Sequence, residues 1–104
     1  MAYSVRITKK AEDDLSEIVN YVSETLMNKR AAAGLISEFQ ENSDILKTSP
    51  YAFSCSADPR LNAEGYRKFI FKKNYIALYL IDDLNKEVSI MRIFYAKSNY
   101  PNLI

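Results

Sequence analysis

The stretch YRKFIFKKNYIALYLIDDLNKEVSIMRIF, residues 66–94, decides the fold of this chain. It contains three runs rich in β-branched and aromatic residues, at 66–71, 75–81 and 88–94, and such composition is typical of strands. Only residues 72–74 and 82–87 separate the runs. Connections this short join antiparallel neighbours, because a parallel crossover needs a dozen residues or more. The stretch therefore predicts a three-stranded antiparallel meander.

Two amphipathic helices are predicted before the meander. Thr8 and Asn28 are of the types that cap helix N-termini, and each stands just before an apolar stripe of helical period. The second helix should end before Pro50. Few residues separate the helices, so they should lie antiparallel as a hairpin. The first stripe contains Leu15, Ile18, Val19, Val22 and Leu26, and the second contains Ala32, Leu35, Ile36, Phe39, Ser43 and Leu46.

The remaining segments complete an α+β prediction for one domain, residues 1–104. Residues 3–7 (YSVRI) alternate apolar and polar and predict an N-terminal strand, which should join one edge of the sheet. Residues 50–65 hold prolines, a glycine and small polar residues, and predict a loop. The expected order is strand, two-helix hairpin and meander, with the helices packed on one face. The other face must be covered by a partner, by the ends of the chain, or remain an exposed apolar patch.

Composition excludes several kinds of chemistry. The 104 residues include no histidine and one cysteine, Cys55. Histidine-based acid–base catalysis and Ser–His–Asp triads are therefore impossible, and no internal disulfide can form. A zinc site would need carboxylates almost alone, so we expect no metal and no cofactor. No apolar run approaches the roughly 20 residues of a membrane helix, and the N-terminus lacks a signal-peptide core, so a cytoplasmic location is expected.

Charge is distributed unequally along the chain. Residues 1–50 carry six basic and eight acidic side chains, whereas residues 51–104 carry eight and five. The second half is therefore the more basic, which fits an acidic or nucleic-acid partner without requiring one.

Two arginines of the meander have both a structural and a functional interpretation. Arg67 begins the first strand of the meander, and it is either a solvated position or a phosphate clamp. Arg92 stands among apolar residues, so it must face water or pair with a carboxylate such as Asp82 or Glu64. Lys72 and Lys73 occupy a turn, where solvation is expected.

The last residues combine aromatic and basic side chains. Tyr95 and Tyr100 flank Lys97, an arrangement that suits stacking on unpaired bases beside a bound phosphate. The alternative is that the two tyrosines cap the edge of the core with their hydroxyls in water. The acidic cluster of Glu12, Asp13 and Asp14 is explained by the positive end of the first helix rather than by a metal.

Four segments resemble the RelE/ParE superfamily of type II toxins over nearly the full chain. TKKAEDDLSEIVNYV (8–22) and LKTSP (46–50) resemble its opening helices, and 66–83 with VSIMRIFYAKSNYPNLI (88–104) resemble its second half. The most specific motif is RIFYAKSNY followed by Leu103 and Ile104. The resemblance implies a toxin neutralised by a cognate antitoxin, one part of which would lie in the groove beside the sheet.

The resemblance implies two possible targets. RelE-type toxins cut mRNA on the ribosome without a metal, and ParE-type toxins poison DNA gyrase. Arg67, Arg92, Tyr95 and Lys97 would be the target-contacting or catalytic residues. However, Ile76 and Ser98 replace arginines common in the nucleases, and a histidine often found near Tyr95 is absent. Losing one transition-state donor can reduce a rate by ~10²–10³.

Three hypotheses follow from these residues and from the resemblance. A ParE-type toxin that acts on gyrase by binding is favoured, because nuclease groups are missing. A ribosome-dependent mRNA endonuclease that uses Arg67, Arg92, Tyr95 and Lys97 is the second, so enzymatic activity stays open. A disarmed module that only binds its partner is the third.

Overall fold

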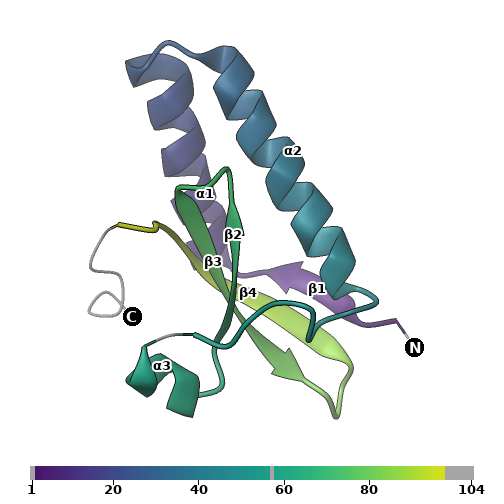
Figure 1. Cartoon of the computed structure of the whole chain (residues 1–104). Helices are drawn as coiled ribbons and strands as arrows, with labels where there is room; N and C mark the ends of the chain where they lie inside the picture. Colours follow the sequence, from purple (N-terminus) through teal and green to yellow (C-terminus); the bar gives the residue numbers. More distant parts are fainter. Residues whose placement is uncertain (1, 57, 98–104) are drawn as a thin grey trace.

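The computed structural model describes residues 2–56 and 58–97 as one open sheet with a helical hairpin on one of its faces (Figure 1). Its strands follow the order β1-β4-β3-β2. The elements are β1 (Ser4–Ile7), α1 (Lys9–Asn20), the π-helix η1 (Tyr21–Thr25), α2 (Lys29–Leu46), α3 (Pro59–Ala63), β2 (Arg67–Phe71), β3 (Tyr75–Asp82) and β4 (Glu87–Tyr95).

The sheet confirms the predicted meander and edge strand. β2, β3 and β4 pair in antiparallel register, from Arg67 opposite Tyr79 to Tyr75 opposite Tyr95. β1 joins the edge beside β4 and runs parallel to it. A bulge interrupts the β3–β4 ladder, because Leu78 pairs with Arg92 whereas its neighbour Tyr79 pairs with Ile90. The extra residue is on β4, and such bulges increase local twist.

Both predicted helix caps are present. The side chain of Thr8 accepts the Ala11 N–H at 3.2 Å, and that of Asn28 accepts the Ala31 N–H at 3.0 Å. Each bond satisfies an N–H that has no partner inside the helix. The local capping signals therefore placed both helix starts correctly.

The end of the first helix differs from the expected regular α-helix. It widens into η1, where the Leu26 N–H donates to the Tyr21 carbonyl at 3.0 Å, five residues back. Leu26 is consequently 56% exposed, although its spacing predicted burial. Ile36, also predicted to be buried, is 48% exposed on α2. The wider turn of η1 is sufficient to rotate Leu26 off its stripe, and it does not account for Ile36.

The main core lies between the hairpin and the sheet. Phe39 of α2 contacts Phe69 and Phe71 of β2, with ring centroids 5.8 and 5.4 Å apart in tilted and edge-on geometries. Such arrangements are preferred over face-to-face stacking. The fully or nearly buried members of this core are Ala11, Val22, Ala32, Leu35, Phe39, Leu46, Phe69, Phe71, Ala77, Tyr79, Val88, Ile90 and Ile93.

A second core covers part of the opposite face. The predicted loop 50–65 contains the short helix α3, capped by the Asp58 carboxylate, and its Leu61 is completely buried. Leu61 clusters with Ile76, Leu78 and Phe94. Three possibilities were open for this face: a partner, the ends of the chain, or exposure. None of them holds for Ile76 and Leu78, which the chain buries under Leu61 of its own 50–65 segment. Among the described residues, no helix is both long and apolar enough to cross a bilayer.

Candidate functional site

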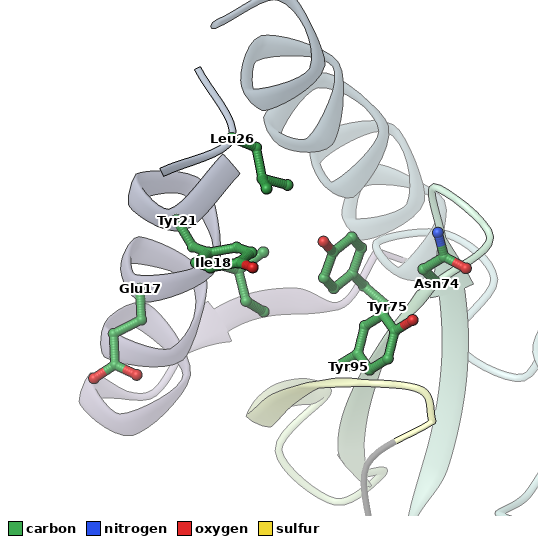
Figure 2. Close-up of a pocket in the computed structure, with 7 residues that line it drawn as sticks. All are labelled: Glu17, Ile18, Tyr21, Leu26, Asn74, Tyr75 and Tyr95. Carbon is green, nitrogen blue, oxygen red and sulfur yellow. The ribbon is translucent and has the colours of Figure 1, made fainter. Parts of the chain in front are cut away.

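Two adjoining cavities lie between the helical hairpin and the end of the sheet where β3 begins and β4 finishes. The first has a volume of about 570 Å³ (Figure 2), and the second about 260 Å³. Because both are lined by Leu26, Asn74 and Tyr75, we treat them as one hairpin groove. Its residues are Glu17, Ile18, Tyr21, Val22, Leu26, Asn28, Ala31, Leu35, Lys72, Asn74, Tyr75 and Tyr95.

The π-helix shapes the helical wall of the hairpin groove. Figure 2 shows Tyr21 and Ile18 on the helix and Leu26 beyond it, on the side that faces Tyr75 and Tyr95. The i to i+5 bond between Tyr21 and Leu26 fixes the backbone at this place. π-Helical turns are rare and are often found at functional sites.

Two tyrosines form the sheet side of the hairpin groove. Tyr75 and Tyr95 are paired across β3 and β4, and their rings meet edge-on at 5.8 Å. Burial, together with neighbouring Tyr95 and Tyr21, raises the pKa of Tyr75 above its ordinary value. The Tyr75 phenol is therefore neutral at physiological pH and offers a hydrogen bond from an otherwise apolar wall.

Exposed apolar side chains gather around the hairpin groove. Tyr21 and Leu26 are more than half exposed, Met27 beside them is 86% exposed, and Tyr95 is 43% exposed. Met27 also has a left-handed backbone, with φ of 51°. An apolar patch of this kind, formed on a strained turn, is typical of a protein interaction surface.

Three lysines surround the sheet end of the hairpin groove. Lys72 and Lys73 form the β2–β3 turn, and Lys97 follows β4 close to Asn74, whose carbonyl accepts the Ala96 N–H at 2.7 Å. All three lysines are exposed, and none forms an ion pair with a residue of 2–56 or 58–97. The rim is therefore cationic, with Glu17 as the acidic group among the lining residues.

Arg67 lies away from the hairpin groove and is engaged by the loop before α3. Its guanidinium donates to the Phe53 and Tyr51 carbonyls at 2.6 and 3.4 Å and lies 3.2 Å from the Cys55 sulfur. It also stacks 5.0 Å from the centre of the Tyr51 ring. In this structure the side chain therefore holds the loop against β2.

Arg92 pairs with an acidic residue of α1. Its Nε and Nη2 donate to the two Asp14 oxygens at 2.7 and 3.2 Å, and its guanidinium lies 4.5 Å from the Phe94 ring centre. The predicted carboxylates Asp82 and Glu64 are wrong as partners. Asp14, interpreted from sequence as helix-terminus electrostatics, lies beside Arg92 because α1 packs along β4, and it also accepts the Ile93 N–H.

The four predicted site residues are not brought together at one point. Arg67 pairs with Tyr79 and Arg92 with Leu78, and adjacent β3 residues point to opposite faces of the sheet. Tyr95 pairs with Tyr75, four residues and roughly 13 Å along β3 from Tyr79. Tyr95 lines the hairpin groove and Lys97 follows near it, whereas Ser98 and Tyr100 lie outside the described residues.

Sequence reasoning missed most of the hairpin groove. Tyr21 and Leu26 lie at the end of the first helix, which was expected to be regular. Asn74 lies in the turn before β3, and Tyr75 is the first residue of that strand. One available signal was the aromatic Tyr21 at the edge of an apolar helical stripe. The groove itself needed the distance between the hairpin and the sheet, which spacing does not contain.

Comparison with known proteins gives a family match and several chains of similar fold. The family profile described as "ParE toxin of type II toxin-antitoxin system, parDE" matches residues 5–100. A chain of the chromosomal ParDE system from P. aeruginosa superposes with a TM-score of 0.71 at 21% identity, covering 92% of this chain and 98% of that one. A search among curated proteins gives no significant match.

Two further solved structures are similar. A chain of the RelBE2 toxin–antitoxin complex from Mycobacterium tuberculosis has a TM-score of 0.61 at 25% identity, covering 91% of this chain and 99% of that one. A chain of the archaeal RelE–RelB complex from Pyrococcus horikoshii OT3 has a TM-score of 0.55 at 18% identity, covering 93% and 98%.

Proposed function

Because this chain belongs to the ParE toxin family of type II toxin–antitoxin systems, we propose that it inhibits growth by binding DNA gyrase rather than by cutting mRNA. Both possible targets are cytoplasmic, so the proposed site of action is the cytoplasm. The family carries the toxin assignment, and the choice of target rests on the arrangement of the basic side chains.

The observation that favours binding is the dispersal of the nuclease candidates. Cleavage of RNA without a metal needs several groups around one phosphate, within hydrogen-bond distance of the reacting atoms. Here Arg67 is bonded to loop carbonyls and Arg92 to Asp14. Tyr95 and Lys97 remain near each other, but two groups alone make a poor site for phosphoryl transfer.

We propose that the hairpin groove binds a segment of the cognate antitoxin. Its apolar walls, its three lining tyrosines and the exposed apolar residues on its helical side are of the kind that a protein partner buries. Two of the similar solved structures are themselves toxin–antitoxin complexes, which supports a partner of this kind. An antitoxin in this groove would also cover Tyr95.

A second candidate function is the ribosome-dependent endonuclease. The proximity of exposed Tyr95 to Lys97 favours it, since an aromatic ring and a cation can hold a base and its phosphate. A third is a module that keeps the fold and binds only the antitoxin.

The test is induction of this chain in cells, with mRNA cleavage and gyrase-linked DNA breaks measured in the same culture. We expect DNA breaks with intact messages. Codon-phased cuts that disappear in Lys97→Ala but persist in Lys10→Ala, a matched loss of charge on exposed α1, would establish the nuclease instead. Continued growth with neither signal would leave the partner-binding module.

A further inference from the structure

We propose that Gly34 and Lys72 act together as the charge-selective element of the hairpin groove, and that they select an acidic amphipathic segment of the partner. This inference rests on the proposed function, because it concerns what the antitoxin must present. It assigns a specific recognition role to two residues that are 38 positions apart in the chain.

Gly34 leaves room for the Lys72 side chain on α2. A methyl group at Gly34 would come within 2.8 Å of both Cε and Nζ of Lys72. The glycine stands in the interior of an 18-residue helix and directly follows three alanines, Ala31, Ala32 and Ala33. Glycine is unfavourable in a helix interior compared with alanine, and here it leaves the surface of α2 open to the end of the Lys72 side chain.

The turn that carries Lys72 has an unfavourable backbone for its residues. Lys72 and Lys73 have φ of 51° and 65°, which glycine or asparagine adopts more readily. The Lys72 backbone N–H donates to the Glu38 carboxylate of α2, which anchors the turn. Left-handed lysines on an anchored turn indicate that the two side chains serve a purpose other than folding.

Lys72 lines the hairpin groove, and its ammonium has no ionic partner among the residues that the structure describes. No carboxylate of residues 2–56 or 58–97 lies within 4 Å of it, and the neighbouring Glu38 carboxylate binds the Lys72 backbone instead. The side chain therefore brings a cation to a largely apolar pocket, which Asn28 and Asn74 line together with Val22, Leu26, Ala31, Leu35 and Tyr75.

Charge complementarity identifies the occupant. The pocket has room for an aliphatic or aromatic side chain. The ammonium of Lys72 can bind a carboxylate beside it, and Lys73 and Lys97 are nearby. An amphipathic helix with an acidic flank offers both at adjacent turns. A nucleic acid fits this pocket less well, because four of its eight lining residues are aliphatic and one, Tyr75, is aromatic, whereas bases stack on flat aromatic faces.

Affinity for the cognate antitoxin, measured by calorimetry at two salt concentrations, tests the proposal. We expect Lys72→Ala to weaken binding by about tenfold and to reduce its salt dependence. Gly34→Ala should weaken it by roughly threefold, because the ammonium is displaced from its place on α2, while raising the melting temperature by about 4 °C. Lys10→Ala should change neither.

A double-mutant cycle separates this coupling from a general disturbance. If Gly34 acts only through Lys72, Gly34→Ala should cost no further affinity in the Lys72→Ala background. If the wild-type chain binds the antitoxin tightly and Lys72→Ala leaves that affinity unchanged, this inference is overturned and the antitoxin partnership stands. The same holds if Lys72→Ala weakens binding of a labelled single-stranded RNA and leaves antitoxin binding unaffected. No binding by the wild-type chain would overturn the antitoxin partnership and the inference together.

Discussion

A guanidinium among apolar strand residues is stable here because an acidic side chain from another element reaches it. The Arg92–Asp14 pair is largely buried, with side-chain exposures of 18% and 16%. Asp14 also accepts the Ile93 N–H at 3.0 Å, so one carboxylate joins α1 to a backbone group and a side chain of β4. β1 ends at Ile7, which pairs with Ile90, so it does not reach Ile93. Asp14 supplies an acceptor for the Ile93 N–H in its place.

Replacing Asp14 with alanine should therefore destabilise the fold. The change leaves Arg92 without its carboxylate and one strand N–H without an acceptor, and we expect a loss of about 2–3 kcal/mol in unfolding free energy. Urea denaturation measures it. The exposed Lys9–Asp13 pair provides the control, since Asp13→Ala should lose less than about 1 kcal/mol. Equal losses would contradict the structural role of Asp14.

Asp83 makes stability depend on pH at both extremes. It accepts hydrogen bonds from the Tyr3 hydroxyl at 2.7 Å and from the Tyr51 hydroxyl. These bonds, of which the one from Tyr3 has the larger effect, hold the pKa of Asp83 below its usual range. The bond to Asp83 in turn raises the pKa of Tyr3 from 10.0 to about 12.

The two shifts have opposite consequences. The Asp83 contribution is present above its unfolded pKa of about 3.9 and is lost as pH falls through the lower folded value. The Tyr3 contribution is present below pH 10 and is lost as pH rises towards 12. Urea midpoints of Asp83→Asn should change less than wild-type midpoints in both ranges. Parallel profiles for the two proteins would contradict this linkage.

At the level of elements, α2 shows how a helical stripe tolerates one polar residue. Ser43 occupies a core position and is 6% exposed. Its hydroxyl has no hydrogen-bond partner among the residues that the structure describes. A buried hydroxyl without a partner carries a desolvation penalty, so this position is less stable than an apolar residue would make it.

Ser43→Ala should consequently stabilise the protein, by about 0.5–1.5 kcal/mol, through removal of the hydroxyl and a better helix propensity. Differential scanning calorimetry measures the change. Ser37→Ala on the exposed side of the same helix gains the propensity term alone, so it should stabilise less. A loss of stability in Ser43→Ala would mean that the hydroxyl is satisfied in solution.

At the level of the whole molecule, the sheet has two cores of unequal size. The hairpin covers one face with most of the buried side chains, and Leu61 of α3 closes a smaller cluster on the other. Arg67 holds the loop that leads to α3 through the Phe53 and Tyr51 carbonyls. Leu61 thus covers the second face, and Arg67 of β2 fixes the loop that precedes its helix.

Leu61→Ala should test this covering role. A completely buried leucine shortened to alanine loses about 2–4 kcal/mol, and the cluster with Ile76, Leu78 and Phe94 becomes accessible. We expect a lower melting temperature and increased binding of a hydrophobic fluorescent dye. Leu84→Ala, at a position 91% exposed, is the control and should change neither. A normal dye signal in Leu61→Ala would show that other residues cover the face.

The amino-acid sequence by itself determined the elements and their order. Capping at Thr8 and Asn28, the helical stripes and the short turns of the meander depend on residues close together in the chain, so local chemistry predicts them. It failed at η1, where the Tyr21–Leu26 bond replaces a regular turn, and at α3, whose proline start resembles a loop.

Only the tertiary structure decided which side chains are available for function. The Arg92–Asp14 pair spans 78 positions and the contact of Lys72 with α2 at Gly34 spans 38, and a single sequence contains no distances between such residues. Arg67 and Arg92 were predicted as candidate site residues, and in the folded chain both are bonded to neighbouring structure. Lys72, in contrast, lies beside the hairpin groove and forms no ion pair with any described residue. The physical reason is that packing determines which charges are paired, and periodicity does not.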